Sequence, residues 1–191
     1  HDGLTGLANR VLFRDRVEHA VERIRRSGGH LALLFIDLDD FKTLNDHHGH
    51  ARGDEVLAAV AERLALVLRP ADTAARVGGD EFSVLLEDVE SESDAVAIAT
   101  RIADSFRQPL FLDAGTFRVA ASIGVAMGAG EESADELLRN ADVAMYAAKQ
   151  SSRGGTEVFQ PGLRDRVAER TARAERLRGV EERDELRLDY Q

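Results

Sequence analysis

A short run of apolar residues, Leu31 to Ile36, limits the folds open to this chain because it leads directly into Asp37-Leu38-Asp39-Asp40. A strand with one wet face would alternate apolar and polar residues, whereas this run is continuous. It therefore predicts a central strand that is buried on both faces and lies in a sheet covered by helices. The end of this strand would carry several carboxylates to one edge of the sheet.

The rest of the chain has the periodicities of helices and strands in turn. The expected helices are about 9–26, 56–68 (ending at Arg69-Pro70), 91–106, and one opened by the capping box Ser133-x-x-Glu136. The other expected strands are 73–77 and 82–86, then 117–127 with one apolar face, and 156–159. This order favours a single α/β or α+β domain with a central sheet covered by helices.

Composition excludes several classes of function and of metal site. The chain of 191 residues has a formal net charge of −10, which argues against a general nucleic-acid binder because such proteins present basic surface to phosphates. It has no cysteine, so disulfides and thiolate metal sites are excluded. Without a membrane-span pattern or a signal peptide, the chain is expected to be cytoplasmic, or the cytoplasmic part of a membrane-bound protein.

Two acidic clusters stand out: Asp37 to Asp40 at the end of one strand, and Asp80-Glu81 in the turn of the 73–86 hairpin. The paired glycines Gly78 and Gly79 would supply positive φ angles for this turn and let a phosphate or a base approach the backbone. Carboxylates from two strand ends form an oxygen site suited to Mg²⁺, which can support phosphoryl transfer. Either cluster alone is more often simply solvated, and the glycines alone fit an ordinary hairpin.

The segment Arg76 to Phe82, RVGGDEF, contains the signature for which the GGDEF domains of diguanylate cyclases are named. The chain resembles that family in further motifs, with order and spacing kept from residue 2 to about 159. These lie in 2–10, 35–46, 49–57, 122–125 and 141–149. The resemblance implies a nucleotide-cyclase or palm-like βααββαβ arrangement with a mostly antiparallel sheet, over residues 1–160.

The resemblance also implies an activity, the condensation of two GTP into cyclic di-GMP by a homodimer. Mg²⁺ or Mn²⁺ would be bound by Asp37, Asp80 and the carbonyl of Leu38, and the catalytic side chains would be Asp80, Glu81 and Lys42. Asn45 and Asp54 would read the guanine edge, as their hydrogen-bonding groups permit. The phosphate-contacting positions would be the backbone at Asp40, Phe41, Gly78 and Gly79, with Lys149 and Arg153.

Some of these positions have ordinary alternatives. Asn45 would also suit the end of a short helix, and Lys149 would suit a solvated surface. The family usually has Gly-Arg-Asn where this chain has Ser152-Arg153-Gly154, which weakens the assignment of Arg153. His47, His48 and His50 crowd one polar loop, where solvent exposure is expected rather than a metal site.

Arg69-Pro70-Ala71-Asp72 resembles the family's Arg-x-x-Asp inhibitory site, which would bind the product cyclic di-GMP with Arg101 as a second contact. Arginine suits this role because its guanidinium pairs with phosphate and stacks on guanine. The alternative is a helix C-terminus with a favourable charge and an aspartate in a turn.

Residues 161–191 are highly charged and resemble a helical linker followed by the start of an EAL phosphodiesterase domain. The chain is thus expected to come from a tandem protein with covalent EAL and sensor domains. Two functions remain open: a diguanylate cyclase with product inhibition, or a GTP-binding regulatory module that controls an attached cyclic di-GMP phosphodiesterase.

Overall fold

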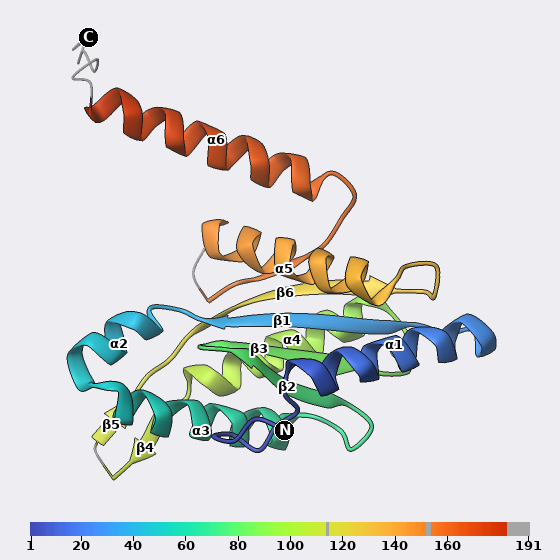
Figure 1. Ribbon diagram of the computed structural model, residues 1–191, viewed down its shortest axis with the longest axis horizontal. Helices are drawn as coiled ribbons and strands as arrows, with labels where there is room; N and C mark the ends of the chain where they lie inside the picture. The colour runs from blue at the N-terminus through green and yellow to red at the C-terminus, as the bar shows by residue number, and fades with distance from the viewer. Residues whose placement is uncertain (114, 152–153, 183–191) are drawn as a thin grey trace. The chain divides into compact units, whose positions relative to one another are not determined.

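The computed structural model describes residues 1–113, 115–151 and 154–182. The chain forms two compact units, one over residues 1–159 and one from residue 160 on. The described part of the second unit consists of one helix, α6 (Leu163–Glu182), drawn in red in Figure 1. Within the described residues, no helix combines the length and the apolarity that crossing a bilayer requires.

The first unit is built on a five-stranded sheet of order β2-β3-β1-β6-β7. The strands are β1 (Leu31–Leu38), β2 (Thr73–Gly78), β3 (Glu81–Leu86), β6 (Ala121–Gly128) and β7 (Thr156–Val158). All neighbouring strands are antiparallel except β6 and β7. The predicted mostly antiparallel sheet is therefore confirmed, and the run Leu31 to Ile36 lies in its central strand (Figure 1).

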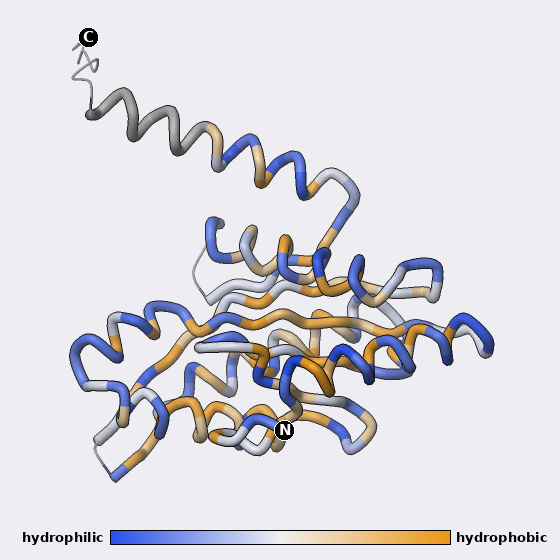
Figure 2. The backbone as a smooth tube through the Cα atoms, viewed as in Figure 1, coloured by the Kyte–Doolittle hydropathy of each residue, from blue (hydrophilic) through white to orange (hydrophobic). Residues whose placement is uncertain are grey.

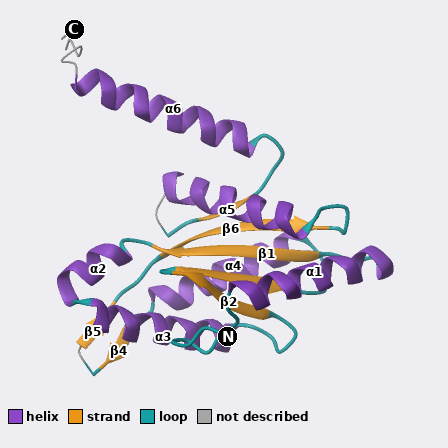
Figure 3. Ribbon diagram, viewed as in Figure 1, coloured by secondary structure: helices purple, strands orange, loops and turns teal. Residues whose placement is uncertain are grey.

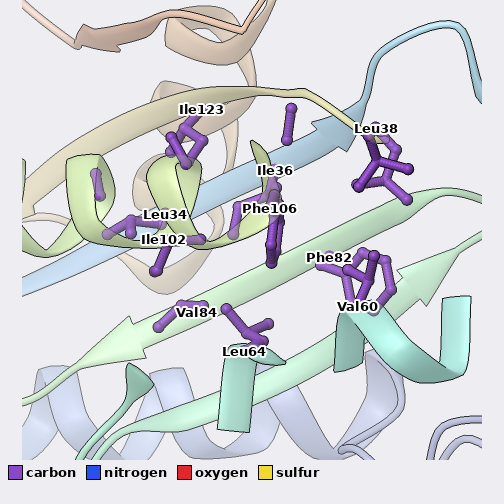
Figure 4. Close-up of a cluster of buried hydrophobic side chains, with 14 of the residues drawn as sticks. Leu34, Ile36, Leu38, Val60, Leu64, Phe82, Val84, Ile102, Phe106 and Ile123 are labelled. Carbon is purple, nitrogen blue, oxygen red and sulfur yellow. The ribbon is translucent and has the colours of Figure 1, made fainter. Parts of the chain in front are cut away.

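Helices cover both faces of this sheet, which explains why β1 is apolar throughout. Leu34 and Ile36 point into one core, which also takes in side chains of α3 (His50–Val67) and α4 (Glu92–Arg107) (Figure 4). Leu31 and Leu33 point into the other core, under α1 (Arg10–Ser27) and α5 (Ala134–Ser151). Successive side chains of a strand face opposite ways, so both sets are buried and the tube of β1 is mostly orange in Figure 2.

The helix starts follow local capping chemistry. Asn9 accepts a hydrogen bond from the Leu12 backbone N–H at the start of α1, at 3.0 Å. The predicted capping box is present before α5: the Glu136 carboxylate accepts from the Ser133 N–H at 2.8 Å, and Ser133 Oγ accepts from the Glu136 N–H at 3.2 Å. Both arrangements satisfy N–H groups that a helix leaves without partners.

Some local predictions were wrong. A helix α2 (Phe41–His48) precedes α3, so His47 and His48 lie in its last turn and His50 begins α3, rather than all three sharing a loop. The expected strand 117–127 is broken, because Phe117 ends β5 (Gly115–Phe117), which pairs with β4 (Leu110–Leu112) in a separate two-stranded sheet. Both faces of β6 are buried, since the small residues of its second face lie under α5.

Gly124 lets α5 pack directly on β6. A Cβ atom at this position would lie 2.1 Å from the carbonyl oxygen of Ala141 and 2.1 Å from the backbone nitrogen of Met145. These are backbone atoms within α5, so rotation of a side chain cannot relieve the clash. The distance between the helix and the sheet is therefore set by a missing side chain.

We predict that Gly124→Ala lowers the free energy of unfolding by about 3 kcal/mol or more, because α5 must move away from the sheet. The matched control is Gly3→Ala, at a position with no atom within 4 Å of the new Cβ. Urea unfolding followed by circular dichroism measures both. Equal unfolding midpoints for the two variants would contradict this account of the packing.

Candidate active site

A cluster of carboxylates lies where β1 and β3 end side by side. Asp37 on β1 is directly opposite Glu81 on β3 in the antiparallel register, and the Leu38 N–H donates to the Asp80 carbonyl at 3.3 Å. Asp37 is buried, with a relative exposure of 7 %. Lys149, near the C-terminus of α5, places its Nζ atom 2.6 Å from Asp37 Oδ1. The structure thus brings the predicted residues Asp37, Asp80, Glu81 and Lys149 together.

Burial and mutual repulsion disfavour the charged forms of these acids. Burial raises the pKa of Asp37, the ion pair with Lys149 lowers it, and the neighbouring carboxylate of Asp80 raises it further. The pKa of Glu81 is also raised, first by burial and then by the charges of Asp37 and Asp142. Burial raises the pKa of Asp142 as well. Such a group of acids attracts cations, and perturbed carboxylates of this kind are frequent in active sites.

Arg76 holds the turn that carries Asp80 and Glu81. Its Nε and Nη2 atoms donate to the Gly79 carbonyl at 2.9 and 2.8 Å, and its Nη1 atom lies 3.4 Å from Asp2 Oδ1. Asp2 in turn accepts from the Thr5 N–H and hydroxyl, at 2.9 and 2.7 Å. These hydrogen bonds, with the charge of Arg76, outweigh partial burial and lower the pKa of Asp2.

The N-terminal segment therefore braces the turn from outside the sheet. Sequence reasoning missed this role, although the segment that contains Asp2 and Thr5 was already recognised as a motif. Positive φ was predicted for both Gly78 and Gly79, whereas of these two only Gly79 has it, at 41°. Gly78 ends β2 without this requirement.

The acidic cluster fits a divalent metal ion. Among the described residues, no group of three or more His, Cys, Asp or Glu side chains is placed so that it could hold a metal ion by itself. Mg²⁺ does not need one, because it usually takes one or two protein carboxylates and completes its shell with water and substrate phosphates. A donor set of this kind is offered by Asp37 and Asp80 at adjoining strand ends, together with the carbonyl of Leu38, which follows Asp37.

Helix α2 begins four residues after Asp37. Its N-cap residue Asp40 has a left-handed backbone, φ 56°, and gives the first turn no side-chain cap. Uncapped N–H groups at a helix start bind anions. Lys42 in this turn is exposed, whereas Phe41 is buried in the core. Arg153 lies outside the described residues.

The predicted base readers lie at the junction of α2 and α3. Asn45 on α2 is half-buried, and Asp54 on α3 is exposed. Figure 1 shows the two helices joined by a sharp bend at one end of the molecule's first unit. The bend is at Gly49, whose positive φ of 83° separates the helices.

Apart from the acidic cluster, the domain has a hollow of about 310 Å³ that is lined in part by Arg69, Asp72 and Arg101. Asp72 Oδ2 accepts from the Arg69 backbone N–H at 2.9 Å, and the Arg101 guanidinium donates to the Val67 carbonyl at the end of α3, also at 2.9 Å. The turn is therefore held through the backbone N–H of Arg69, whose side chain lines the hollow.

Comparison with known proteins identifies the family. The model of the diguanylate cyclase GGDEF domain matches residues 1–155, which include the acidic cluster and the α2–α3 junction. The chain belongs to the GGDEF family. It is 45 % identical over 164 residues to the diguanylate cyclase TpbB of Pseudomonas aeruginosa, covering 84 % of this chain and 37 % of TpbB. It is also 41 % identical over 192 residues to MucR of the same organism, a bifunctional diguanylate cyclase and cyclic di-GMP phosphodiesterase, covering all of this chain and 28 % of MucR.

Solved GGDEF structures have the same fold. The GGDEF domain of TpbB superposes with a TM-score of 0.84 at 40 % identity, covering 88 % of this chain and 99 % of that one. The GGDEF domain of DgcB from Caulobacter crescentus, solved with cyclic di-GMP, superposes with a TM-score of 0.78 at 31 % identity, covering 83 % of this chain and 94 % of that one. This GGDEF chain spans between 16 % and 37 % of the length of the curated relatives compared.

We predict that Glu81→Gln raises the thermal midpoint of this GGDEF domain at pH 7 and does not raise it near pH 4. The folded-state pKa of Glu81 is raised, so the folded state holds this proton more tightly than the unfolded state. Stability is therefore lost as the pH rises through the raised pKa, and a residue that cannot ionise avoids this loss.

Differential scanning calorimetry at both pH values makes this measurement. Glu62→Gln, at an exposed helical position, is the control for loss of one negative charge. A Glu81→Gln variant that is less stable than the parent at pH 7 would show that the carboxylate is favourably bound and not repelled.

Proposed function

We propose that this domain is a diguanylate cyclase that condenses two GTP molecules into cyclic di-GMP with release of pyrophosphate. The observation that carries the proposal is the pairing of Asp37 with Glu81 across β1 and β3, beside Asp80 and Lys149. Family membership and similarity to the cyclase TpbB support the same activity. The reaction needs a 3′-hydroxyl deprotonated and a phosphate charge neutralised, and the cluster has groups for both.

In this mechanism Asp37, Asp80 and the Leu38 carbonyl would hold Mg²⁺ or Mn²⁺. A divalent ion at such a site lowers the pKa of a bound hydroxyl and stabilises charge on phosphate oxygens. Glu81, whose pKa is raised, is suited to take the proton of the attacking 3′-hydroxyl. That oxygen forms a bond to the α-phosphorus of the other GTP, and the bond from the α-phosphorus to the bridging oxygen breaks to release pyrophosphate.

The remaining residues bind and orient GTP. The uncapped start of α2, at Asp40 and Phe41, and the turn at Gly78 and Gly79 would lie along the phosphates. Lys42, Lys149 and Arg153 would supply positive charge to them. Asn45 and Asp54 would pair with the guanine edge, so the base would lie at the junction of α2 and α3.

The proposed reaction requires two copies of the chain. Each domain binds one GTP, and the 3′-hydroxyl of each attacks the α-phosphate of the other. A homodimer with the two acidic clusters facing each other satisfies this geometry.

We predict that Asp80→Asn lowers cyclic di-GMP formation at least about 100-fold, because it removes a negative metal ligand from an exposed turn while leaving the core intact. Asp113→Asn, in the β4–β5 turn, removes the same charge away from the cluster and should keep the parent rate. Each protein is incubated with GTP and Mg²⁺, and product is measured by chromatography. Parent-like turnover by Asp80→Asn would remove Asp80 from the metal site.

We also propose that the hollow lined by Arg69, Asp72 and Arg101 binds the product, and that the bound product inhibits the enzyme. Arg69, Asp72 and Arg101 lie together there, and a guanidinium suits both the phosphates and the guanine rings of cyclic di-GMP. The complex of DgcB with cyclic di-GMP shows that a related domain binds this molecule. Product bound at this site would oppose the dimer geometry in which the two acidic clusters face each other.

We predict that Arg69→Ala weakens cyclic di-GMP binding about tenfold or more, since it removes a charge-assisted hydrogen bond. Arg26→Ala, on the exposed end of α1, is the matched control. Isothermal titration calorimetry of product into each variant gives the affinities. Unchanged affinity in Arg69→Ala would leave Arg69 as a helix-terminal charge.

A second function is a GTP-binding module that regulates an attached phosphodiesterase. The observation that favours it is the reach of the similarity: matches to MucR and to the cyclic di-GMP phosphodiesterase PdeR of Escherichia coli cover all of this chain, whereas the match to TpbB covers 84 %. The segment 161–191 would then lead into an EAL domain, with sensor domains elsewhere in the protein. Retention of GTP without turnover in the same incubation would favour this function.

A further inference from the structure

Gly53 on α3 directly faces Asn45 on α2 across the bend at Gly49. A Cβ atom at Gly53 would lie 1.9 Å from Asn45 Oδ1, 2.9 Å from Asn45 Cγ and 3.1 Å from Phe41 Cζ. The backbone of Gly53 is ordinary right-handed helix and does not itself require glycine. The position requires glycine because another side chain occupies the space of its Cβ.

The contact fixes which way the Asn45 amide points. Its Oδ1 atom is buried and has no hydrogen-bond partner within the described residues. It occupies the space that a Cβ at Gly53 would take, so a side chain at residue 53 would displace it. With the oxygen turned inward, the planar amide directs its two N–H donors away from Gly53.

We propose that Gly53 determines guanine selectivity by holding the Asn45 amide in this orientation beside Asp54. The inference rests on the proposed function of Asn45 and Asp54 as base readers. Asp54 follows Gly53 in the sequence, so one short stretch of α3 supplies a carboxylate acceptor and orients an amide donor. Guanine presents N–H donors and acceptor atoms along one edge, whereas adenine lacks the N1–H and has an amino group in place of O6.

A methyl group at Gly53 would act on the base site more than on the fold. The closest atoms belong to the end of the Asn45 side chain, which can rotate away, and Phe41 Cζ needs to move only slightly. Alanine also favours a helix interior over glycine. Gly53→Ala should therefore leave α3 formed and displace the amide that meets the base.

The test uses four proteins: the parent, Gly53→Ala, Asn45→Ala and the double variant. Each is titrated calorimetrically with the 3′-deoxy forms of GTP and ATP in Mg²⁺, which bind but cannot be condensed. We expect Gly53→Ala to lose about tenfold in affinity for the guanine nucleotide and nothing for the adenine nucleotide. Added to Asn45→Ala, it should cost no further affinity, because it acts through Asn45.

Thermal midpoints of the same four proteins separate this role from a purely structural one. Gly53→Ala should raise the midpoint more in the Asn45→Ala background than in the parent, because the crowded amide is then absent. An equal loss of stability in both backgrounds would overturn the proposal, as would a parent-like preference for guanine in Gly53→Ala. A parent chain that does not prefer guanine would instead refute base reading by Asn45 and Asp54, and the inference with it.

Discussion

The antiparallel pairing of β1 with β3 is the interaction on which the site depends. It sets Asp37 opposite Glu81 and joins Leu38 to Asp80, so acids from distant parts of the sequence meet at one edge of the sheet. Their repulsion and burial oppose this arrangement, as the raised pKa values of Asp37 and Glu81 show. The register is nevertheless held, because slipping by one residue would turn Leu34 and Ile36 out of one core and Leu33 out of the other.

Other elements are positioned relative to this strand pair by close contacts. Gly124 allows α5 to lie against β6, and the last turns of α5 bring Lys149 to Asp37. Arg76 ties the Gly79 carbonyl to Asp2, so the turn that carries Asp80 is braced by the N-terminal segment. Gly53 similarly lets α2 approach α3 at Asn45. The proposed metal, phosphate and base-reading groups are thus placed by two close approaches at glycines and by the side-chain bonds of Arg76 and Lys149.

Local patterns were sufficient to predict the elements that have strong periodicity or capping signals. The run Leu31 to Ile36 and the capping box of Ser133 and Glu136 depend on neighbours in sequence, and both were confirmed. Periodicity did not reveal helix α2, because its eight residues bury one side chain, Phe41, and begin at a left-handed Asp40; the βααββαβ arrangement implied by the family resemblance does include it. The break between Phe117 and Ala121 was missed because Phe117 and Val119 stay buried outside β6. The motifs predicted the candidate site residues, but the contacts of Gly53 with Asn45 and of Arg76 with Asp2 join separate segments, which periodicity cannot show.

The most direct test of the central claim is the initial rate of cyclic di-GMP formation from GTP and Mg²⁺ over a range of chain concentrations. If the paired carboxylates form half of a shared active site, product should form, and at low concentration its rate should rise more steeply than the amount of chain. Binding of GTP without product at any concentration would contradict the claim that this cluster is catalytic.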